Sequence, residues 1–528
     1  MTKTTFLRGA MILTLAGIVV KILGGVNRIL LSRFLGGEGI GLYQMAYPMY
    51  ILLLSIAGAG IPIAVSIMIA DRTAQGDMKG ARRVFHVVLL FMIIVALACG
   101  VGMALGAGWL IQTGLVRDQR AYLPLVVLAP ALTISVITCC FRGYFQGLQL
   151  MTPTAVSQML DQFVRVCTML ALAFFFLPYG LEAAAAGATF GAVPGALAGL
   201  AIIVWYFYRH MKEPLQDNGL SFPKAPAFGI IKRLVILAVP VAAANMLLPA
   251  VASIDLFIVP QRLEVAGYTI KEATTLFGYL TGMASGLVQL PAILTMALAT
   301  SLVPAVSAAY SKGDFQVIMA RTNTAMRIAN LITMPASLGL AVLAVPISQM
   351  LYATPLAGPA ICVLSISVFL VGIQQITSGL LQGMGHTGIP LMNMVLAALL
   401  KIALSWHLTA IPWLGEVGAA WATNADLAAA AALNLYFAYR FAHYGLQWGF
   451  MGKLLASSAL TAAAAWAVYH GIALVTGNTV ATSAAIVAAL GVYAAALLVF
   501  RIVALEDVRR IPVMGPRIEG AASRFLKK

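Results

Sequence analysis

The sequence carries few charged residues for its length. Only 9% of its 528 residues are charged and 61% are hydrophobic, whereas a soluble globular domain has about 25% charged residues. The mean hydropathy is +0.95. So little polar surface cannot cover a soluble globule, and we predict an all-α polytopic membrane protein.

Cysteine is also scarce, and its placement excludes the usual cysteine sites. The chain has no CxxC pair and no metal-ligand spacing among its five cysteines, which all fall inside apolar runs: Cys99, Cys139, Cys140, Cys167 and Cys362. We interpret them as packing residues.

The common enzyme motifs are missing as well. The sequence contains no Walker loop, no HExxH and no GxSxG, and the glycine-rich stretch GGEGIG at 36–41 follows an apolar run rather than a strand. We interpret this stretch as a turn between two membrane spans. The sequence therefore predicts neither an enzyme nor a bound cofactor.

Acidic residues are about half as frequent as basic ones, and the formal net charge is +16. Of the 33 Lys and Arg residues, 24 lie in one alternating set of loops and tails and only four in the opposite set, which are Arg117, Arg120, Arg262 and Lys271. Cytoplasmic loops of membrane proteins are rich in Lys and Arg. This distribution predicts a multi-pass plasma-membrane protein with both termini cytoplasmic and with no nucleic-acid partner.

The apolar runs between these loops predict fourteen membrane-spanning helices. Their expected bounds are 6–35, 41–70, 84–112, 121–148, 154–178, 182–209, 230–260, 274–309, 321–350, 357–383, 388–411, 416–441, 451–473 and 480–504. The longest cytoplasmic link contains three prolines and separates the first twelve helices into two sets of six. We predict a six-helix half at 1–210, a cytoplasmic linker at 211–229, a second six-helix half at 230–443, helices 13 and 14 at 450–504, and a basic cytoplasmic tail at 505–528 that is drawn to membrane lipids.

The two sets of six helices resemble each other at an offset of about 236 residues. YFQGLQLMTP at 144–153 matches LLQGMGHTGIP at 380–390, and QGD at 75–77 matches KGD at 312–314. The starts of the sixth and twelfth spans also match, because Glu182 and Glu416 each precede a Gly-Ala pair. Three matches in the same order predict two parallel repeats around a central cavity, the arrangement in which transporters hold substrate near the membrane midplane.

Charged residues inside the first span are the most informative feature. KILGGVNRILLSR at 21–33 contains Lys21, Arg28 and Arg33. A charge in hydrocarbon costs at least about 2.5 to 3.5 kcal/mol, so such residues usually face a wet cavity. Lys21 and Arg28 are seven residues apart and share a helix face, whereas Arg33 lies near the outer end and can reach the interface. We predict that Lys21 and Arg28 line an anion pathway.

Further charges occur in other spans. Asp161 and Arg165 are spaced i and i+4 and can pair with each other, which is a structural alternative to a binding role. Arg165 aligns with Lys401 in the second repeat, and Lys401 has no acidic residue nearby in sequence. Lys21, Arg28, Arg165 and Lys401 are therefore our candidate ligands for a diphosphate headgroup.

Two smaller groups of residues are candidates for other roles. Asp255, Asn245 and Asp426 are candidates for either a structural role or coupling to a cation, Na⁺ or H⁺. The candidate hinges are glycines and prolines inside spans, where a helix bends easily: Gly24, Gly25, Pro240 and Pro249.

The chain resembles a known family through several of these motifs. KILGGVNRILLSR, LPAILTMALATSLVPAVSAAYSKGD and the two QG repeats are similar to the stage V sporulation protein B-like branch of the polysaccharide transporters. This branch belongs to the multidrug/oligosaccharidyl-lipid/polysaccharide (MOP) flippase superfamily, which includes lipid II flippases.

The resemblance implies translocation of an undecaprenyl-diphosphate-linked saccharide, with lipid II as the leading substrate, from the inner to the outer leaflet. It also implies that Lys21 matches the first basic residue of the family's cavity. Two alternatives stay open: a cation-coupled multidrug exporter of the same superfamily, and a non-transporting membrane scaffold for cell-wall synthesis proteins.

Overall fold

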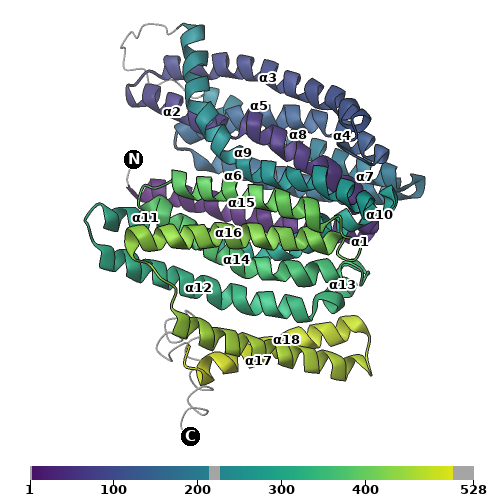
Figure 1. Ribbon diagram of the computed structural model, residues 1–528. Coiled ribbons are helices and arrows are strands. Elements are labelled where there is room, and N and C mark those ends of the chain that lie inside the picture. Colours follow the sequence, from purple (N-terminus) through teal and green to yellow (C-terminus); the bar gives the residue numbers. More distant parts are fainter. Residues whose placement is uncertain (1–2, 213–225, 503–528) are drawn as a thin grey trace. The chain divides into compact units, whose positions relative to one another are not determined.

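The structure is a computed structural model that describes residues 3–212 and 226–502. Over these residues the chain forms helices and no strand (Figure 1). The elements are α1 Lys3–Gly58, α2 Ile61–Ala74, α3 Met78–Gln112, η1 Gln119–Ala121, α4 Tyr122–Val127, α5 Ala129–Gly147, α6 Met151–Phe176, η2 Leu177–Tyr179, α7 Leu181–Phe190, α8 Ala192–Met211, α9 Ala227–Val265, α10 Ile270–Phe277, η3 Gly278–Ala284, α11 Ser285–Tyr310, α12 Phe315–Val342, α13 Ala344–Tyr352, α14 Gly358–Gly383, α15 Gly388–Leu408, α16 Glu416–Ala442, α17 Trp448–Ala473 and α18 Asn478–Val499. The predicted all-α fold is confirmed. The predicted tail at 505–528 and most of the predicted linker at 211–229 lie outside the described residues.

Among the described residues, twelve segments are long and apolar enough to cross a membrane. The first segment, Leu15–Ala74, is 60 residues long, whereas one crossing needs about 20, so this segment holds two of the predicted spans. Helix α16 matches the predicted span 416–441 but is not one of the twelve. When the first segment is counted as two spans and α16 is added, each of the fourteen predicted spans has a helix. The chain is therefore a polytopic membrane protein.

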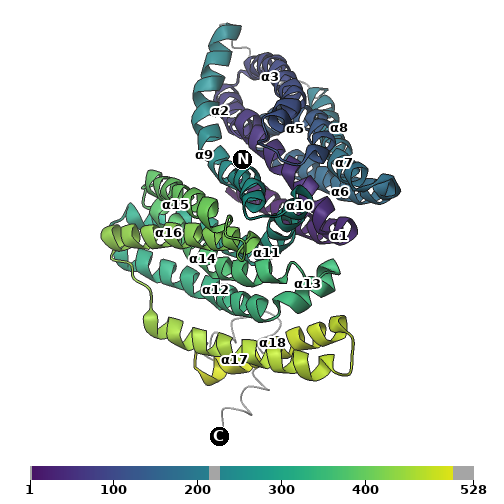
Figure 2. The ribbon, with the colours of Figure 1, turned by 45° about the vertical axis from the view of Figure 1, so that its right-hand side comes forward.

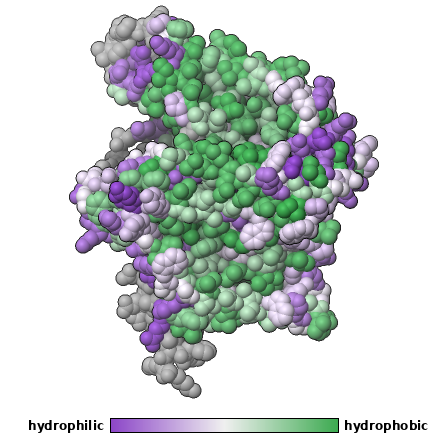
Figure 3. All heavy atoms as spheres, in the orientation of Figure 1, coloured by the Kyte–Doolittle hydropathy of each residue, from purple (hydrophilic) through white to green (hydrophobic). Residues whose placement is uncertain are grey.

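Hydrophobic residues cover the long sides of the helices on the face drawn in Figure 3, and hydrophilic residues gather near the helix ends. Large apolar side chains that face outward are frequent along single helices. Examples on α3 are Leu90, which is 65% exposed, and Leu105, which is 75% exposed. In water such surfaces would be unfavourable, so their contact must be with lipid.

A single glycine divides α1 into two membrane spans. Gly36 has φ 65° and ψ −173° within the continuous α1 assignment, a combination that essentially only glycine adopts. The break predicted between the two spans is therefore present, but it is confined to Gly36, and residues 37–41 of the predicted turn are helical. The second part of α1 then carries the row of tyrosines described below.

The internal repeat predicted from sequence is visible in equivalent contacts. A Cβ atom added at Gly143 would lie 2.9 Å from the backbone of α2, and one added at Gly379 would lie 2.9 Å from the backbone of α11. Glycine therefore lets α5 approach α2 in one repeat and α14 approach α11 in the other. The turns that follow also agree, because Gln149 and Gly385 have φ values of 60° and 85°.

The Gly-Asp pairs at 76–77 and 313–314 also have the same backbone conformation at glycine, and in both the aspartate caps the following helix. Gly76 and Gly313 have φ values of 78° and 69°. Asp77 caps α3 by accepting a 2.7 Å hydrogen bond from the third backbone N–H of that helix, and Asp314 caps α12 in the same way at 3.0 Å. A side-chain cap of this kind stabilises a helix by about 1 kcal/mol.

The described chain separates into two compact units. The first unit contains Met1–Gly286 and Ile402–Ala419, and the second contains Leu287–Lys401 and Ala420–Lys528. Helices α9 and α10 therefore pack with the first unit, although they follow the linker in sequence. The division into six-helix halves stays a prediction.

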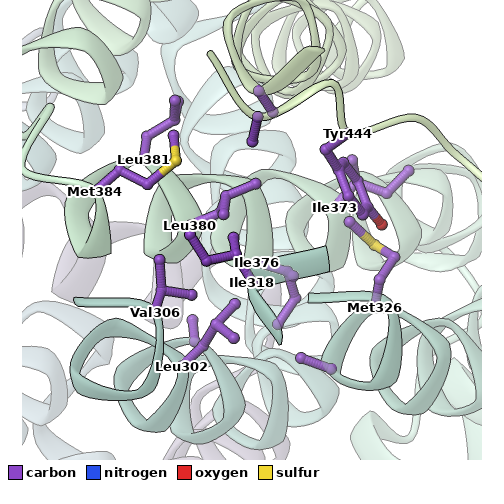
Figure 4. Close-up of a cluster of buried hydrophobic side chains, with 14 of the residues drawn as sticks. Leu302, Val306, Ile318, Met326, Ile373, Ile376, Leu380, Leu381, Met384 and Tyr444 are labelled. Atoms are coloured by element: carbon purple, nitrogen blue, oxygen red, sulfur yellow. The ribbon is translucent and has the colours of Figure 1, made fainter. Parts of the chain in front are cut away.

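The second unit has its own apolar core, to which α11, α12, α14 and α16 contribute (Figure 4). Ile376 and Leu380 are fully buried there, and Tyr444 and Met326 lie beside each other at one side of it. Helices α17 and α18 pack along each other and against α12 (Figures 1 and 2). These last two helices have no counterpart in the repeat.

Candidate functional site

The first part of α1, which carries Lys21 and Arg28, packs along α6, which carries Asp161 and Arg165. The Asn27 amide lies 3.5 Å from the Met169 sulfur. Lys21 is exposed and Arg28 is half-buried. The stem of Arg28 crosses Gly286, where an added Cβ would lie 2.7 Å from Arg28 Cδ. The absence of a side chain at Gly286 therefore makes the room in which Arg28 lies.

Asp161 of α6 is held by two arginines. Arg165 Nη2 donates to Asp161 Oδ1 at 3.0 Å, and Arg142 Nη2 lies 3.6 Å from Asp161 Oδ2. Arg142 also donates to Ser157 Oγ at 3.2 Å, and Ser157 donates to the Gly199 carbonyl oxygen at 2.9 Å. The i, i+4 pair predicted from sequence exists, but a second guanidinium shares the same carboxylate, so this group keeps a net positive charge.

A row of tyrosines on α1 interacts with both Arg28 and Arg165. Tyr43 stacks on Tyr47 with ring centroids 5.2 Å apart, and Tyr47 lies 5.8 Å from Tyr50. Tyr43 and Tyr47 each interact electrostatically with both guanidinium groups. The row therefore connects the cation of the first span with the arginines of α6.

We call these seven side chains the first-unit cationic site: Arg28, Tyr43, Tyr47, Tyr50, Arg142, Asp161 and Arg165. Three guanidinium groups and one carboxylate give it a net charge of about +2 if all four groups are ionised, which is the usual state of Arg. Guanidinium forks bind phosphate oxygens in pairs, and phenolic O–H groups can donate further hydrogen bonds. The site is suited to binding a multiply charged anion inside the membrane.

The second unit has a different polar group at the matching position. Ser378 and Asn393 stand 236 residues beyond Arg142 and Ser157. Asn393 Nδ2 donates to Asn434 Oδ1 at 2.9 Å, and Asn434 Nδ2 donates to Ser378 Oγ at 2.9 Å. A neutral amide network therefore takes the place of the Arg142–Ser157 contact, whereas Lys401 keeps a basic residue at the position that matches Arg165.

The four predicted cations are divided between the units. Lys21, Arg28 and Arg165 belong to the first unit, and Lys401 belongs to the second, where it is buried with 4% exposure. The structure brings Arg28 and Arg165 to one row of tyrosines. The joint diphosphate site of all four residues stays a prediction.

The remaining candidates occupy different surroundings. Asp426 is buried with 9% exposure, Asp255 is half-buried and Asn245 is exposed. Within residues 3–212 and 226–502, no three His, Cys, Asp or Glu side chains form a group that could hold a metal ion. A coupling role for these three residues stays a prediction.

The predicted hinges all lie within continuous helix. Gly24 and Gly25 are inside the first part of α1, and Pro240 and Pro249 are inside α9. The non-helical backbone in α1 is at Gly36. A hinge role for the four predicted positions would need them to bend in another state, and it stays a prediction.

An ion-pair cluster ties together the loops near Gly36. Arg120 forms salt bridges with Glu38 at 2.6 Å and with Asp118 at 2.7 Å, and Lys271 lies 3.6 Å from Glu38. Thr274 donates to Asp118 at 2.8 Å. Burial opposes ionisation of Asp118, but the hydrogen bonds from Arg120 and Thr274 outweigh it and lower the pKa of this carboxyl. The loop after α3, the turn of α1 and α10 are thereby joined.

The other two cations of the sparse loop set also have partners. Arg117 pairs with Glu264 at 2.6 Å. Arg262 lies over the Trp406 ring at 4.4 Å and donates to its carbonyl oxygen at 2.8 Å. Each of the four basic residues on this predicted outer side is therefore engaged within the first unit.

Sequence reasoning missed two parts of the first-unit cationic site. The tyrosines stand at i, i+4 and i+7 on one helix face, a spacing that could have indicated them. Arg142 is one of the 24 basic residues of the predicted cytoplasmic set, and its contact with Asp161 depends on how α5 packs beside α6. The sequence carries no local signal for that contact.

Comparison with known proteins agrees with this fold. Residues 6–310 match the family described as polysaccharide biosynthesis protein. Stage V sporulation protein B of Bacillus subtilis (strain 168) is 30% identical over 98% of this chain and 99% of its own length. Lipid II flippase MurJ of the same organism is 27% identical over 76% of this chain and 77% of its own length.

Solved structures of low sequence identity show the same fold. A structure of lipid II flippase MurJ in an inward closed conformation superposes with a TM-score of 0.71 at 14% identity, over 93% of this chain and 98% of that one. An inward-facing multidrug resistance MATE family transporter of the MOP superfamily gives 0.65 at 17% identity, over 80% and 94%. These relatives are transporters and not enzymes, as predicted. The chain therefore belongs to the polysaccharide biosynthesis protein family and is a multi-pass membrane flippase of the MOP superfamily.

Proposed function

We propose that this flippase moves an undecaprenyl-diphosphate-linked cell-wall precursor, with lipid II as the leading substrate, from the inner to the outer leaflet by alternating access. The similarity to a protein named lipid II flippase over 76% of the chain supports this substrate class. The family description, polysaccharide biosynthesis protein, supports a lipid-linked saccharide more generally.

The first-unit cationic site is the observation that carries the proposal. Arg28 and Arg165 lie within segments that can span a membrane, and Tyr43 and Tyr47 interact electrostatically with both. A diphosphate brings two negative charges and several oxygens, which matches the surplus of guanidinium groups. The polyprenyl chain needs no polar partner and can stay in the surrounding lipid.

The direction of transport follows from the predicted topology. With both termini cytoplasmic, Lys21 lies nearer the cytoplasmic end of the first span than Arg28. A headgroup that entered from the inner leaflet would meet Lys21 first and would then reach Arg28. We propose that this order of cations guides the diphosphate into the membrane.

The energy source is part of the same proposal. Coupling to Na⁺, H⁺ or the membrane potential would make transport directional, and Asp255, Asn245 and Asp426 are our candidates for a cation. A multidrug exporter would need an accessible carboxylate for cationic drugs, whereas Asp161, the carboxylate of this site, is held by two arginines. A scaffold without transport would not need intramembrane cations, which are costly.

Complementation of a bacterial strain depleted of its own lipid II flippase tests this function. The wild-type chain should restore growth, and Arg28→Ala should abolish growth at an unchanged protein level. Arg33→Ala is the matched control, because Arg33 lies in the same span and is predicted to be an outer-end anchor. Full growth with the double variant Lys21→Ala/Arg28→Ala would overturn the cationic pathway.

A further inference from the structure

A hollow in the second unit lies where α12 meets the start of α17. It is lined by α12, by the link between α16 and α17, and by the first turn of α17. It opens to the surroundings, and the space inside it, about 10 Å³, has room for about one water-sized group. The lining includes an arginine, two asparagines and a tyrosine next to methionine and phenylalanine. It belongs to no part of the first-unit cationic site.

Arg327 supplies a positive charge to the hollow. Its guanidinium lies 5.0 Å from the centre of the Phe450 ring, and its Nη2 donates to the Ile502 carbonyl oxygen at 3.2 Å. The side chain is exposed. A guanidinium carries five N–H donors, so these two contacts leave further donors for a ligand.

Asn330 supplies a buried acceptor. The residue is 1% exposed, and its Nδ2 lies 3.4 Å from the Met451 sulfur. Its Oδ1 is buried and accepts no hydrogen bond from any residue that the structure describes. An unsatisfied buried acceptor is destabilising, so a ligand that donates a hydroxyl hydrogen to Asn330 Oδ1 would be favoured there.

The hollow lies at the level of lipid headgroups. Trp448 begins α17 directly beside it and is 76% exposed, and tryptophan concentrates at the membrane–water interface. Lys453, in the second turn of α17, is exposed too. Both belong to the side that the charge distribution predicts to be cytoplasmic, and the cytoplasmic leaflet carries the anionic lipids.

We propose that this hollow binds the headgroup of an anionic phospholipid that carries a hydroxyl group, such as phosphatidylglycerol. The phosphate lies at the mouth of the hollow and accepts from the exposed Arg327, and the headgroup hydroxyl enters the hollow and donates to Asn330 Oδ1. The Tyr493 hydroxyl already fastens α18 to the Leu331 carbonyl oxygen of α12 at 2.7 Å. A lipid bound at the adjacent hollow would add to the attachment of α17 and α18, which gives these two appended helices a role as a lipid-dependent brace.

Thermal unfolding of the full chain in nanodiscs tests the proposal. Phosphatidylglycerol is titrated into nanodiscs of phosphatidylcholine. The unfolding midpoint of each variant is compared with the midpoint of the same variant in phosphatidylcholine alone, so that a general loss of stability does not affect the comparison. Wild type should show a saturable rise of the unfolding midpoint. Arg327→Gln should need about tenfold more phosphatidylglycerol for the same rise, as expected for loss of a hydrogen bond to a charged group.

Arg321→Gln is the matched control, because Arg321 is exposed on the same helix and lies outside the hollow. It should respond as wild type does. Equal weakening by both arginine substitutions would show a general surface-charge effect and would overturn the site. An unchanged response in Arg327→Gln would also overturn it.

The hydroxyl is tested with phosphatidylmethanol, an anionic lipid whose headgroup has no hydroxyl group. Wild type should prefer phosphatidylglycerol, and Asn330→Leu should remove that preference. Inorganic phosphate is the second probe. If phosphate raises the unfolding midpoint and phosphatidylglycerol does not, the hollow binds a free anion and not a lipid, and the proposal is overturned. Arg327→Gln should still restore growth of the strain depleted of its own lipid II flippase, because Arg327 lies outside the first-unit cationic site. A weaker response to phosphatidylglycerol without a loss of growth therefore reports on this hollow and not on transport.

Discussion

Asp161 and Arg165 form an ion pair one helical turn apart on α6, with Oδ1 and Nη2 separated by 3.0 Å. Arg142 approaches the other oxygen of the same carboxylate at 3.6 Å. The carboxylate therefore holds two guanidinium groups in place and does not cancel the charge of either completely. This arrangement reconciles a structural ion pair with a cationic site, because Asp161 orients the arginines while positive charge is left for a ligand.

Removing the carboxylate should destabilise the first unit. Asp161→Asn leaves Arg165, which is 8% exposed, without its charged partner, and breaking a buried pair typically costs about 3–5 kcal/mol. The unfolding midpoint of the purified protein should fall clearly. The double variant Asp161→Asn/Arg142→Gln should recover part of the loss because it removes one of the two unpaired cations. A double variant less stable than the sum of the two single losses would contradict the shared-carboxylate arrangement.

The break in α1 should depend on glycine at one position. Gly36→Ala places a Cβ on a backbone with φ 65° and ψ −173°, which costs about 1–3 kcal/mol. Gly17→Ala is the control, since Gly17 lies in helical backbone of α1 with open space around it, and alanine there should be neutral or stabilising. Thermal unfolding of both variants checks this difference. Equal midpoints would mean that the turn does not need the left-handed conformation.

The ion-pair cluster near Gly36 should weaken in acid. The pKa of Asp118 is lower in the folded protein than the usual value of about 3.9 in an unfolded chain. A depressed carboxyl pKa contributes stability above the unfolded pKa, and this contribution is lost as the pH falls through the folded pKa. The Asp118 contribution should be constant between about pH 5 and 7, should begin to decrease below about pH 4, and should be lost as the pH falls through the folded pKa of Asp118.

Unfolding midpoints of wild type and Asp118→Asn across this range isolate that contribution. The variant should be less stable at neutral pH, and the gap between the two proteins should close in acid. A gap of constant size down to pH 3 would show that ionisation of Asp118 is not what stabilises the cluster.

The helices and the repeat could be predicted from sequence because their signals are local. Apolar runs give the spans, and the Gly-Asp pairs at 76–77 and 313–314 cap helices in the same way wherever they occur. The first-unit cationic site could be predicted only in part. Arg28 and Arg165 stand out as charges in apolar runs, whereas Arg142 joins them through the packing of α5 beside α6.

The composition of the two units depends on contacts that no local pattern encodes. Helix α10 packs with α1 because Gly41 and Gly278 remove the side chains that would collide: an added Cβ at Gly41 would lie 2.1 Å from the Thr274 carbonyl oxygen, and one at Gly278 would lie 2.0 Å from the Gly37 carbonyl oxygen. These glycines look ordinary in the sequence. Only the packing of the two segments shows that a side chain at either position would collide with the backbone of the other segment.

The leaflet distribution of polyprenyl-diphosphate-linked saccharides after depletion of this protein in its native cell tests the central claim most directly. Inner-leaflet and total pools are measured before and after depletion, and cells that express Arg28→Ala are compared with cells that express Arg33→Ala. We predict that one such saccharide, with lipid II as the leading candidate, accumulates in the inner leaflet on depletion and in the Arg28→Ala cells, but not in the Arg33→Ala cells. Unchanged leaflet pools of every polyprenyl-diphosphate-linked saccharide would contradict the account.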